Sequence, residues 1–224
     1  MKERPILFSA PMVRALLAGT KTQTRRAVKH QPGPSCLIEE GFEGESPFVY
    51  SALYGDGPGH EVHEARTPCV CPYGRPGDRL WVRETWCRKW DDERGFLDEC
   101  WYRASNPDVV SVDAMEKSPW KPSIHMPRWA SRILLEITGV RVERLQDINE
   151  MDAAAEGVAT WAPGALSPDS LNADPSDQFR WLWTSINGPD SWGANPWVWV
   201  VDFKLVQQAS SGRSLHLEGA TCSV

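Results

Sequence analysis

The strongest strand signal in the chain covers residues 133–145, where aliphatic and β-branched side chains dominate. Gly139 interrupts this run, and a glycine inside a strand indicates a β-bulge or a sharp bend. Bends of this kind allow a sheet to curl into a small barrel. The segment therefore predicts a strand with a bulge or sharp bend, as in a small barrel.

Strands near both ends of the chain are expected to join this sheet. Residues 4–8 alternate around Ile6 and Phe8, and the closing strand 197–206 contains Val198 and Val200. We expect these four side chains to share one core, which predicts a single domain over residues 1–206. The other expected elements are a strand over 79–86, its partner over 96–104, a helical turn over 126–132, and helices over 12–17, 150–157 and 178–186.

Several polar stretches separate or follow these elements. They are rich in Gly, Pro, Ser or acidic residues, and we interpret three of them as loop insertions, at 31–70, 105–120 and 158–176. Residues 207–224 carry little apolar surface and are predicted to form a disordered tail. The expected fold class is α+β.

The sequence also limits the compartment and the cofactors. No apolar run approaches the roughly 20 residues that span a bilayer, and no signal peptide follows Met1, so we expect a cytoplasmic protein without membrane contact. A metal site is conceivable at four residues, His60, His63, Cys69 and Cys71. Their spacing is poor for structural zinc, so we interpret the cysteines as ordinary reduced thiols. No metal and no cofactor are predicted.

The segment Gly19–Arg26 is unusually basic and rich in hydroxyl groups. The first 30 residues contain seven Lys or Arg and one Asp or Glu, whereas the whole chain has a formal net charge of −6. Gly19 suits the left-handed residue that ends a short helix with Ser9 as its N-cap. The segment is either a local anion site built from Lys21, Arg25 and Arg26, or a solvated connection after the helix.

Three motifs occur in a characteristic order. The first is Gly-x-Lys-Thr-x-Thr-Arg at 19–25, and a Pro-Gly-Asp turn then leads into Leu-Trp-Val-Arg-Glu-Thr-Trp at 80–86. The third is Glu-x-x-Ala-x-x-Glu-Gly at 150–157. In this order they resemble the ASCH family, and more narrowly its phage and prophage members. The resemblance implies a small PUA-like β-barrel, mixed or antiparallel, flanked by short helices.

The resemblance also implies a function. ASCH proteins are generally proposed to bind RNA or nucleotides, and some small bacterial relatives hydrolyse the acetyl amide of acetylcytidine with a lysine, a threonine and a glutamate. Lys21, Thr24 and Glu156 fall on these three positions. This chain is far longer than those relatives, and its inserted loops could reshape the cleft.

The same chemistry can be argued from the residues. An amide hydrolase needs a nucleophile, for which Thr24 is a candidate, and a base, for which Lys21 requires a lowered pKa. In an extended strand these two residues point to opposite faces, so the chain must turn between them. Glu156 at a helix C-terminus needs a compensating cation or solvent, and Lys21 could be that cation. Alternatively, Lys21 binds phosphate and Thr24 bonds within its own turn.

Further residues are candidates for ligand binding. Glu84 shares a face with apolar residues and either pairs with an arginine or has a functional role. Trp86 and Trp129, or Trp81, could stack on a base. We favour binding of a nucleoside, a nucleotide or short single-stranded RNA, because the overall acidity argues against extended nucleic-acid contacts. A hydrolase of an acylated nucleoside is the alternative, and a structural phage role is the third.

Overall fold

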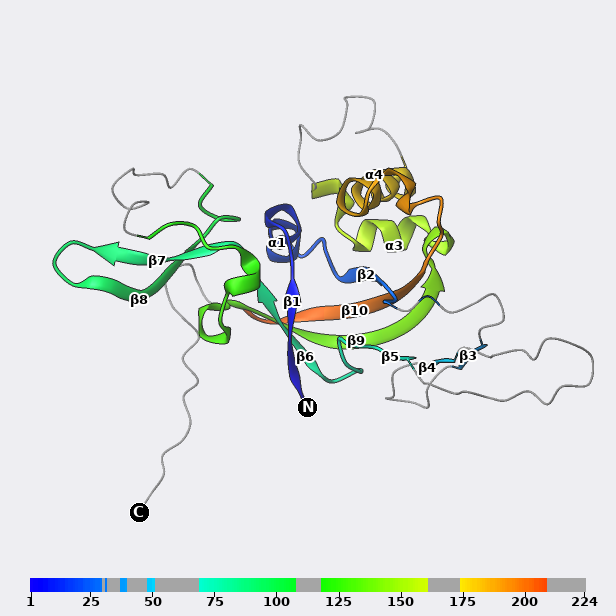
Figure 1. The fold of residues 1–224 in the computed structure, drawn as a ribbon, viewed down its shortest axis with the longest axis horizontal. Coiled ribbons are helices and arrows are strands. Elements are labelled where there is room, and N and C mark those ends of the chain that lie inside the picture. Colours follow the sequence, from blue (N-terminus) through cyan, green and yellow to red (C-terminus); the bar gives the residue numbers. More distant parts are fainter. Residues whose placement is uncertain are drawn as a thin grey trace, which may run out of the picture.

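The computed structural model describes residues 1–29, 31, 37–39, 48–50, 69–107, 118–160 and 174–208. Its largest element is a five-stranded sheet with the order β1-β6-β9-β10-β2 (Figure 1). The strands are β1 (Glu3–Leu7), β2 (Gln23–Ala27), β6 (Arg79–Arg83), β9 (Ile133–Arg144) and β10 (Trp197–Gln208). β1 runs parallel to β6, and the other pairs are antiparallel. The fold is mixed α+β, and strands from both ends of the sequence belong to one sheet.

Helices and smaller sheets surround the main sheet. The helices are α1 (Ala10–Leu17), α3 (Glu150–Ala155) and α4 (Pro175–Asn187). β7 (Trp86–Asp91) and β8 (Gly95–Tyr102) form a hairpin, and β3 (Leu37–Glu39), β4 (Phe48–Tyr50) and β5 (Cys69–Val70) form a small sheet. The 3-10 turns are η1 (Ser123–His125), η2 (Arg128–Ala130), η3 (Leu145–Asp147), η4 (Val158–Thr160) and η6 (Pro189–Ser191). The hairpin extends away from the sheet on the side opposite α3 and α4 (Figure 1).

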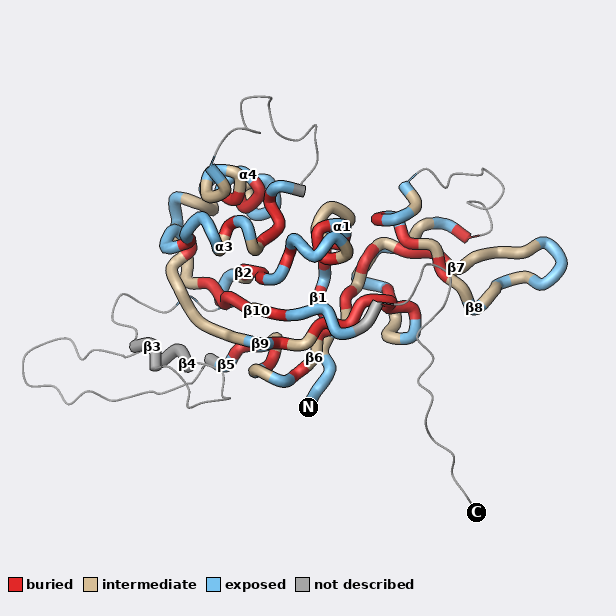
Figure 2. Tube along the Cα trace, turned by 180° about the vertical axis from the view of Figure 1, so that it is seen from behind, coloured by how far each residue is buried: buried red, intermediate tan, exposed pale blue. Residues whose placement is uncertain are grey.

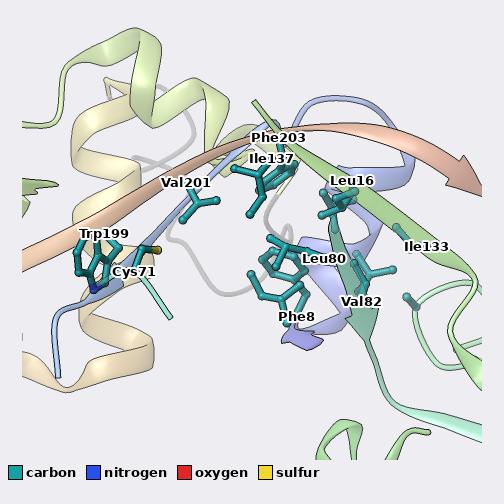
Figure 3. Close-up of a cluster of buried hydrophobic side chains, with 14 of the residues drawn as sticks. Phe8, Leu16, Cys71, Leu80, Val82, Ile133, Ile137, Trp199, Val201 and Phe203 are labelled. Carbon is teal, nitrogen blue, oxygen red and sulfur yellow. The ribbon is translucent and has the colours of Figure 1, made fainter. Parts of the chain in front are cut away.

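Strand β10 is buried on both of its faces, and Figure 2 shows its middle as a buried segment. On one face Trp199 and Val201 pack in a cluster with Phe8 and Leu80 (Figure 3). On the other face Val198 and Val200 pack in a second cluster against residues of α3 and α4. The expectation that Val198 and Val200 share a core with Ile6 and Phe8 was wrong, because strand alternation turns them to the opposite face.

The register of the sheet is irregular at Gly139 in β9. The register between β9 and β10 shifts beside Gly139, where Asp202 pairs with Gly139 and Phe203 with Ile137. The predicted irregularity is thus confirmed. Closure into a barrel is not: β1 and β2 are the two ends of the strand order in the described residues. One side chain does link these edges, since Arg26 donates a hydrogen bond to the carbonyl of Leu7 at 2.7 Å.

Some predicted elements differ in their boundaries. The strand predicted over 79–86 ends at Arg83, and β7 starts anew at Trp86 and pairs with β8 outside the main sheet. The chain leaves the sheet at Glu84, whose buried carboxylate binds Arg132. The helical turn predicted over 126–132 is present as the shorter 3-10 turn η2, with Pro127 at its N-cap, and a second turn, η1, precedes it.

The last strand is longer than predicted. β10 continues to Gln208, so the first two residues of the predicted tail pair with β9. The rest of that tail, and most of the predicted insertions 31–70, 105–120 and 158–176, lie outside the described residues.

The two core clusters predict which aliphatic residues contribute most to the free energy of unfolding. Leu80 is fully buried in the first cluster, so Leu80→Ala should lower the free energy of unfolding by about 2–5 kcal/mol through lost burial and a residual cavity. Urea unfolding measures the loss. Leu205→Ala, at an exposed position of β10, is the control and should have a much smaller effect. Equal losses in both variants would contradict the assigned core.

Candidate functional site

The segment between α1 and β2 is fixed against the C-terminal end of α3. Gly19 ends α1 with a φ of +74°, as predicted for a left-handed residue. Lys21 then forms an isolated antiparallel bridge with Glu156, and Thr22 N–H donates to the carbonyl of Ala155 at 2.8 Å. The two segments touch closely at Gly157, where an added Cβ would lie 2.9 Å from that of Lys21. Glycine is required there both for space and for its φ of +78°.

Lys21 is buried and its ammonium group is fully hydrogen-bonded. Nζ donates to the carboxylate Oε2 of Glu156 at 2.6 Å, to the carbonyl of the same residue at 2.9 Å and to the carbonyl of Gln23 at 2.8 Å. These three acceptors use all three N–H groups of an ammonium. Burial lowers the pKa of Lys21, Glu156 opposes this shift, and Arg26 and Arg25 add to it. A lysine that acts as a base needs a lowered pKa, and the pKa of Lys21 is lowered. However, all three N–H groups of its ammonium are already bonded to protein acceptors, so none is left for a substrate.

Glu156 is the C-cap of α3, and its carboxylate is almost entirely buried. The predicted ion pair with Lys21 is confirmed, and the ammonium also binds the Glu156 carbonyl at the negative end of the helix. The second carboxylate oxygen, Oε1, has no hydrogen-bond partner among the described residues; Arg25 Nη1 lies 3.8 Å from it. A buried acceptor without a partner is costly and rare, which makes Oε1 the chemically most distinctive atom of the site.

Arg25 is enclosed by acceptors rather than presented to solvent. Its guanidinium donates to Glu143 and to Asp152, both at 3.0 Å, and to the side-chain oxygen of Gln23. Its side chain is fully buried. The prediction that Lys21 and Arg25 form an open anion site is therefore wrong, because carboxylates distant in the sequence neutralise both cations.

Thr24 and Glu156 meet in a pocket of about 60 Å³, which we call the Glu156 pocket. Its lining residues are Met12, Thr24, Arg25, Arg26, Ala27, Glu156, Phe179, Leu182, Trp183, Ile186 and Asn187. Lys21 is not among them and lies behind Glu156. No hydrogen bond joins Thr24 to Lys21 in the part of the chain that the structure describes, so the structure brings Lys21 to Glu156 and Glu156 to Thr24, but not Lys21 to Thr24 directly.

Arg26 is the one basic residue of the segment Gly19–Arg26 that remains partly exposed. It lines the Glu156 pocket and its guanidinium lies over the ring of Phe8, 5.4 Å from the centroid. Its Nη2 is bound to the Leu7 carbonyl, and its buried Nε has no hydrogen-bond partner in the described structure. Arg26 is therefore the candidate in this segment for binding an anion.

Three predicted ligand-binding residues lie elsewhere, at the base of the β7–β8 hairpin. Glu84 forms a buried bidentate pair with Arg132 at 2.9 and 3.0 Å, so its interpretation as the partner of an arginine is confirmed. Burial raises the pKa of Glu84, and Arg132 opposes the shift. Trp86 is buried in a third cluster, and Trp129, which is 42% exposed, contacts it edge-on. None of the three lines the Glu156 pocket.

Sequence reasoning missed the carboxylates that organise the site. Asp152 accepts hydrogen bonds from Arg25, Gln23 and Arg141, and Glu143 accepts from Arg25 and Arg141. Arg141 and Glu143 are two residues apart in β9 and thus share a face, which was the available signal. Asn149 caps α3, since its side chain accepts from the Asp152 N–H at 2.8 Å.

Other site types find no support in the described residues. Within them no group of three His, Cys, Asp or Glu is placed to hold a metal. His60 and His63 lie outside the described residues, and Cys71 packs in the first core cluster. Among the helices that are described, none has the length and apolarity to cross a membrane.

Comparison with models of protein families, with curated proteins and with solved structures found no match to this chain. The resemblance to the ASCH family therefore stays a prediction that rests on the three motifs and their order.

The buried ion pair predicts a specific pattern of stability. Lys21→Met leaves a buried carboxylate without its cation and should cost about 3–5 kcal/mol in the free energy of unfolding. The double variant Lys21→Met with Glu156→Gln should recover part of this loss, because the remaining side chain is uncharged. Chemical denaturation checks both. Lys204→Met, at an exposed pair with Glu136, is the control and should change little. A double variant less stable than Lys21→Met would contradict the prediction.

Asp152 predicts a loss of stability in acid. Burial alone would raise the pKa of Asp152, but hydrogen bonds from Gln23 and Arg25 and the charges of Arg141 and Arg25 hold it below its ordinary value of 3.8. A carboxyl with a depressed pKa in the folded state stabilises the fold above the unfolded value, and this contribution disappears as pH falls through the folded value. Stability should therefore drop below about pH 4.

Urea unfolding between pH 6 and 2 measures that drop. Asp152→Asn should lower stability by about 1–3 kcal/mol at pH 6 and flatten the acid dependence. Asp98→Asn, at a largely exposed carboxylate, is the matched control. An unchanged acid profile in Asp152→Asn would contradict the assignment.

Proposed function

We propose that this protein binds an acylated nucleoside in the Glu156 pocket and hydrolyses its amide bond. One observation carries the proposal. Glu156 has a buried oxygen without a hydrogen-bond partner, in a pocket that it shares with the hydroxyl-bearing Thr24. A buried carboxylate paired with a lysine, in the same pocket as a hydroxyl, is a combination that can activate an oxygen nucleophile. The order of the three motifs supports membership of the ASCH family and a PUA-like fold as part of the same proposal.

The roles proposed here differ from a simple lysine base. Glu156 Oε1 accepts the proton of the Thr24 hydroxyl as its oxygen attacks the acyl carbon. The C–N bond breaks, and the proton passes to the departing amine of the nucleoside. Water then attacks the acyl-threonine ester, which releases the carboxylic acid and restores the hydroxyl. Lys21 acts as a positioning residue, because it donates to both the carboxylate and the carbonyl of Glu156, while its third hydrogen bond, to the Gln23 carbonyl, holds the ammonium in place.

N4-acetylcytidine is the test substrate, with release of cytidine followed by chromatography. Glu156→Gln should abolish release, because an amide of the same shape cannot accept a proton, and Thr24→Val should do the same by removing the nucleophile. Glu136→Gln, at a partly exposed carboxylate outside the pocket, should retain full activity. Retained activity in Glu156→Gln would overturn the proposed mechanism, and absence of release by the unmodified protein would overturn the hydrolase.

A second candidate is binding of a nucleotide or short single-stranded RNA without hydrolysis. Arg26 favours it, because its guanidinium lines the pocket and is not fully buried. A phosphate on Arg26 would make the affinity fall with added salt, and Arg26→Gln would flatten that dependence. Salt-independent binding of nucleosides and nucleotides alike would leave the neutral nucleoside as the ligand.

A further inference from the structure

Helix α4 does more than fill the core. Phe179, Leu182 and Trp183 are buried in the second cluster, and the same three side chains, with Ile186, form the apolar wall of the Glu156 pocket. The facing wall comes from β2 and Glu156 and is polar. The pocket therefore lies between an aromatic surface and a hydrogen-bonding surface, the arrangement typical of sites for planar organic ligands.

One residue of the apolar wall, Trp183, also carries a polar atom. The indole Nε1 of Trp183 is buried and has no hydrogen-bond partner in the described part of the chain. Buried tryptophans normally find an acceptor for this N–H group. On the polar wall Glu156 Oε1 is a buried acceptor that likewise lacks a partner, and the Nε atoms of Arg25 and Arg26 are further buried donors without one. Residues of both walls thus carry unmatched polar atoms, an acceptor on Glu156 and donors on Trp183, Arg25 and Arg26.

The charges around the pocket exclude many ligands. Lys21 and Arg25 are already paired with Glu156, Glu143 and Asp152, so these cations are not free to compensate a buried anion. A carboxylate ligand would be placed next to the carboxylate of Glu156, and the partly exposed Arg26 is the pocket cation left to offset that repulsion. A neutral ligand avoids this cost.

We propose that Trp183 is a specificity-determining residue that donates its indole N–H to a carbonyl oxygen of a neutral, planar amide, while Glu156 accepts the amide N–H. This inference rests on the proposed function, since it concerns the same pocket, but it concerns recognition rather than cleavage. It explains why a helix that packs as a core element also carries an unmatched donor. An acyl amide on a nucleobase has the required carbonyl and N–H side by side.

The test is a nuclear magnetic resonance titration that does not depend on catalysis. Indole ¹⁵N–¹H signals are recorded, and Trp183→Phe identifies the signal of Trp183 by its disappearance. Acetamide should shift this signal in a saturable manner, and acetate at the same concentrations should not. Acetate moving the signal as strongly as acetamide, or saturating acetamide leaving it in place, would overturn the proposal. Because the readout is taken on the unmodified protein, it stands even where the variant folds poorly; the signal is then assigned by elimination with phenylalanine variants of the other tryptophans.

The affinity for N4-acetylcytidine gives an independent measurement. Trp183→Phe should weaken binding about tenfold, the loss expected for one buried hydrogen bond. Trp192→Phe is the matched control, because Trp192 packs on the same cluster and contacts Phe179 but does not line the pocket. Equal affinities of Trp183→Phe and the unmodified protein would overturn the role of Trp183. Failure of the hydrolase alone appears differently, as a shifted Trp183 signal and intact binding without release of cytidine.

Discussion

The ion pair between Lys21 and Glu156 is the interaction on which the site depends. It joins residues 135 positions apart in the sequence and holds the segment after α1 against the end of α3. Burying both charges is expensive, and attraction between them compensates only when the remaining hydrogen-bonding capacity is also used. The lysine meets that condition with two backbone carbonyls, whereas the glutamate leaves one oxygen unmatched. The unsatisfied hydrogen-bonding capacity of the pair therefore lies on Glu156, the member of the pair that lines the pocket.

The charge distribution of the chain has a structural explanation. The N-terminal segment is basic, and its cations receive carboxylates from β9, α3 and the residue that follows α3. Arg141 extends this network by binding Glu143, Asp152 and Asp202. What reads in the sequence as a cationic turn in an acidic protein is, in the fold, a set of balanced pairs around Lys21 and Arg25, with Arg26 left partly exposed. This balance favours a neutral ligand over the phosphate that the local composition indicated.

The sequence predicted those parts of the fold that depend on local pattern. The long strand with its irregularity at Gly139, the helix that packs Phe179 into the core, and the pairing of Lys21 with Glu156 all have recognisable signals. Partners that the topology brings together were not accessible in this way. Trp129 was expected to bind the ligand, but it contacts Trp86, the first residue of β7. The sequence did not show that β6 ends at Arg83 and that Trp86 belongs to a separate hairpin. The burial of β10 on both faces was likewise hidden, since alternation alone does not reveal that both faces are covered.

The strand order has a consequence for how the protein is made. Among the described strands β2 pairs only with β10, which is the last to leave the ribosome. The segment with Thr24 therefore stays without its strand partner until residues 197–208 have been synthesised. Pairing of such distant segments is a slow step in folding, because a long loop must close before any contact repays it. Until then the backbone groups of β2 have no partner strand. A chain truncated before β10 would therefore be at risk of aggregation.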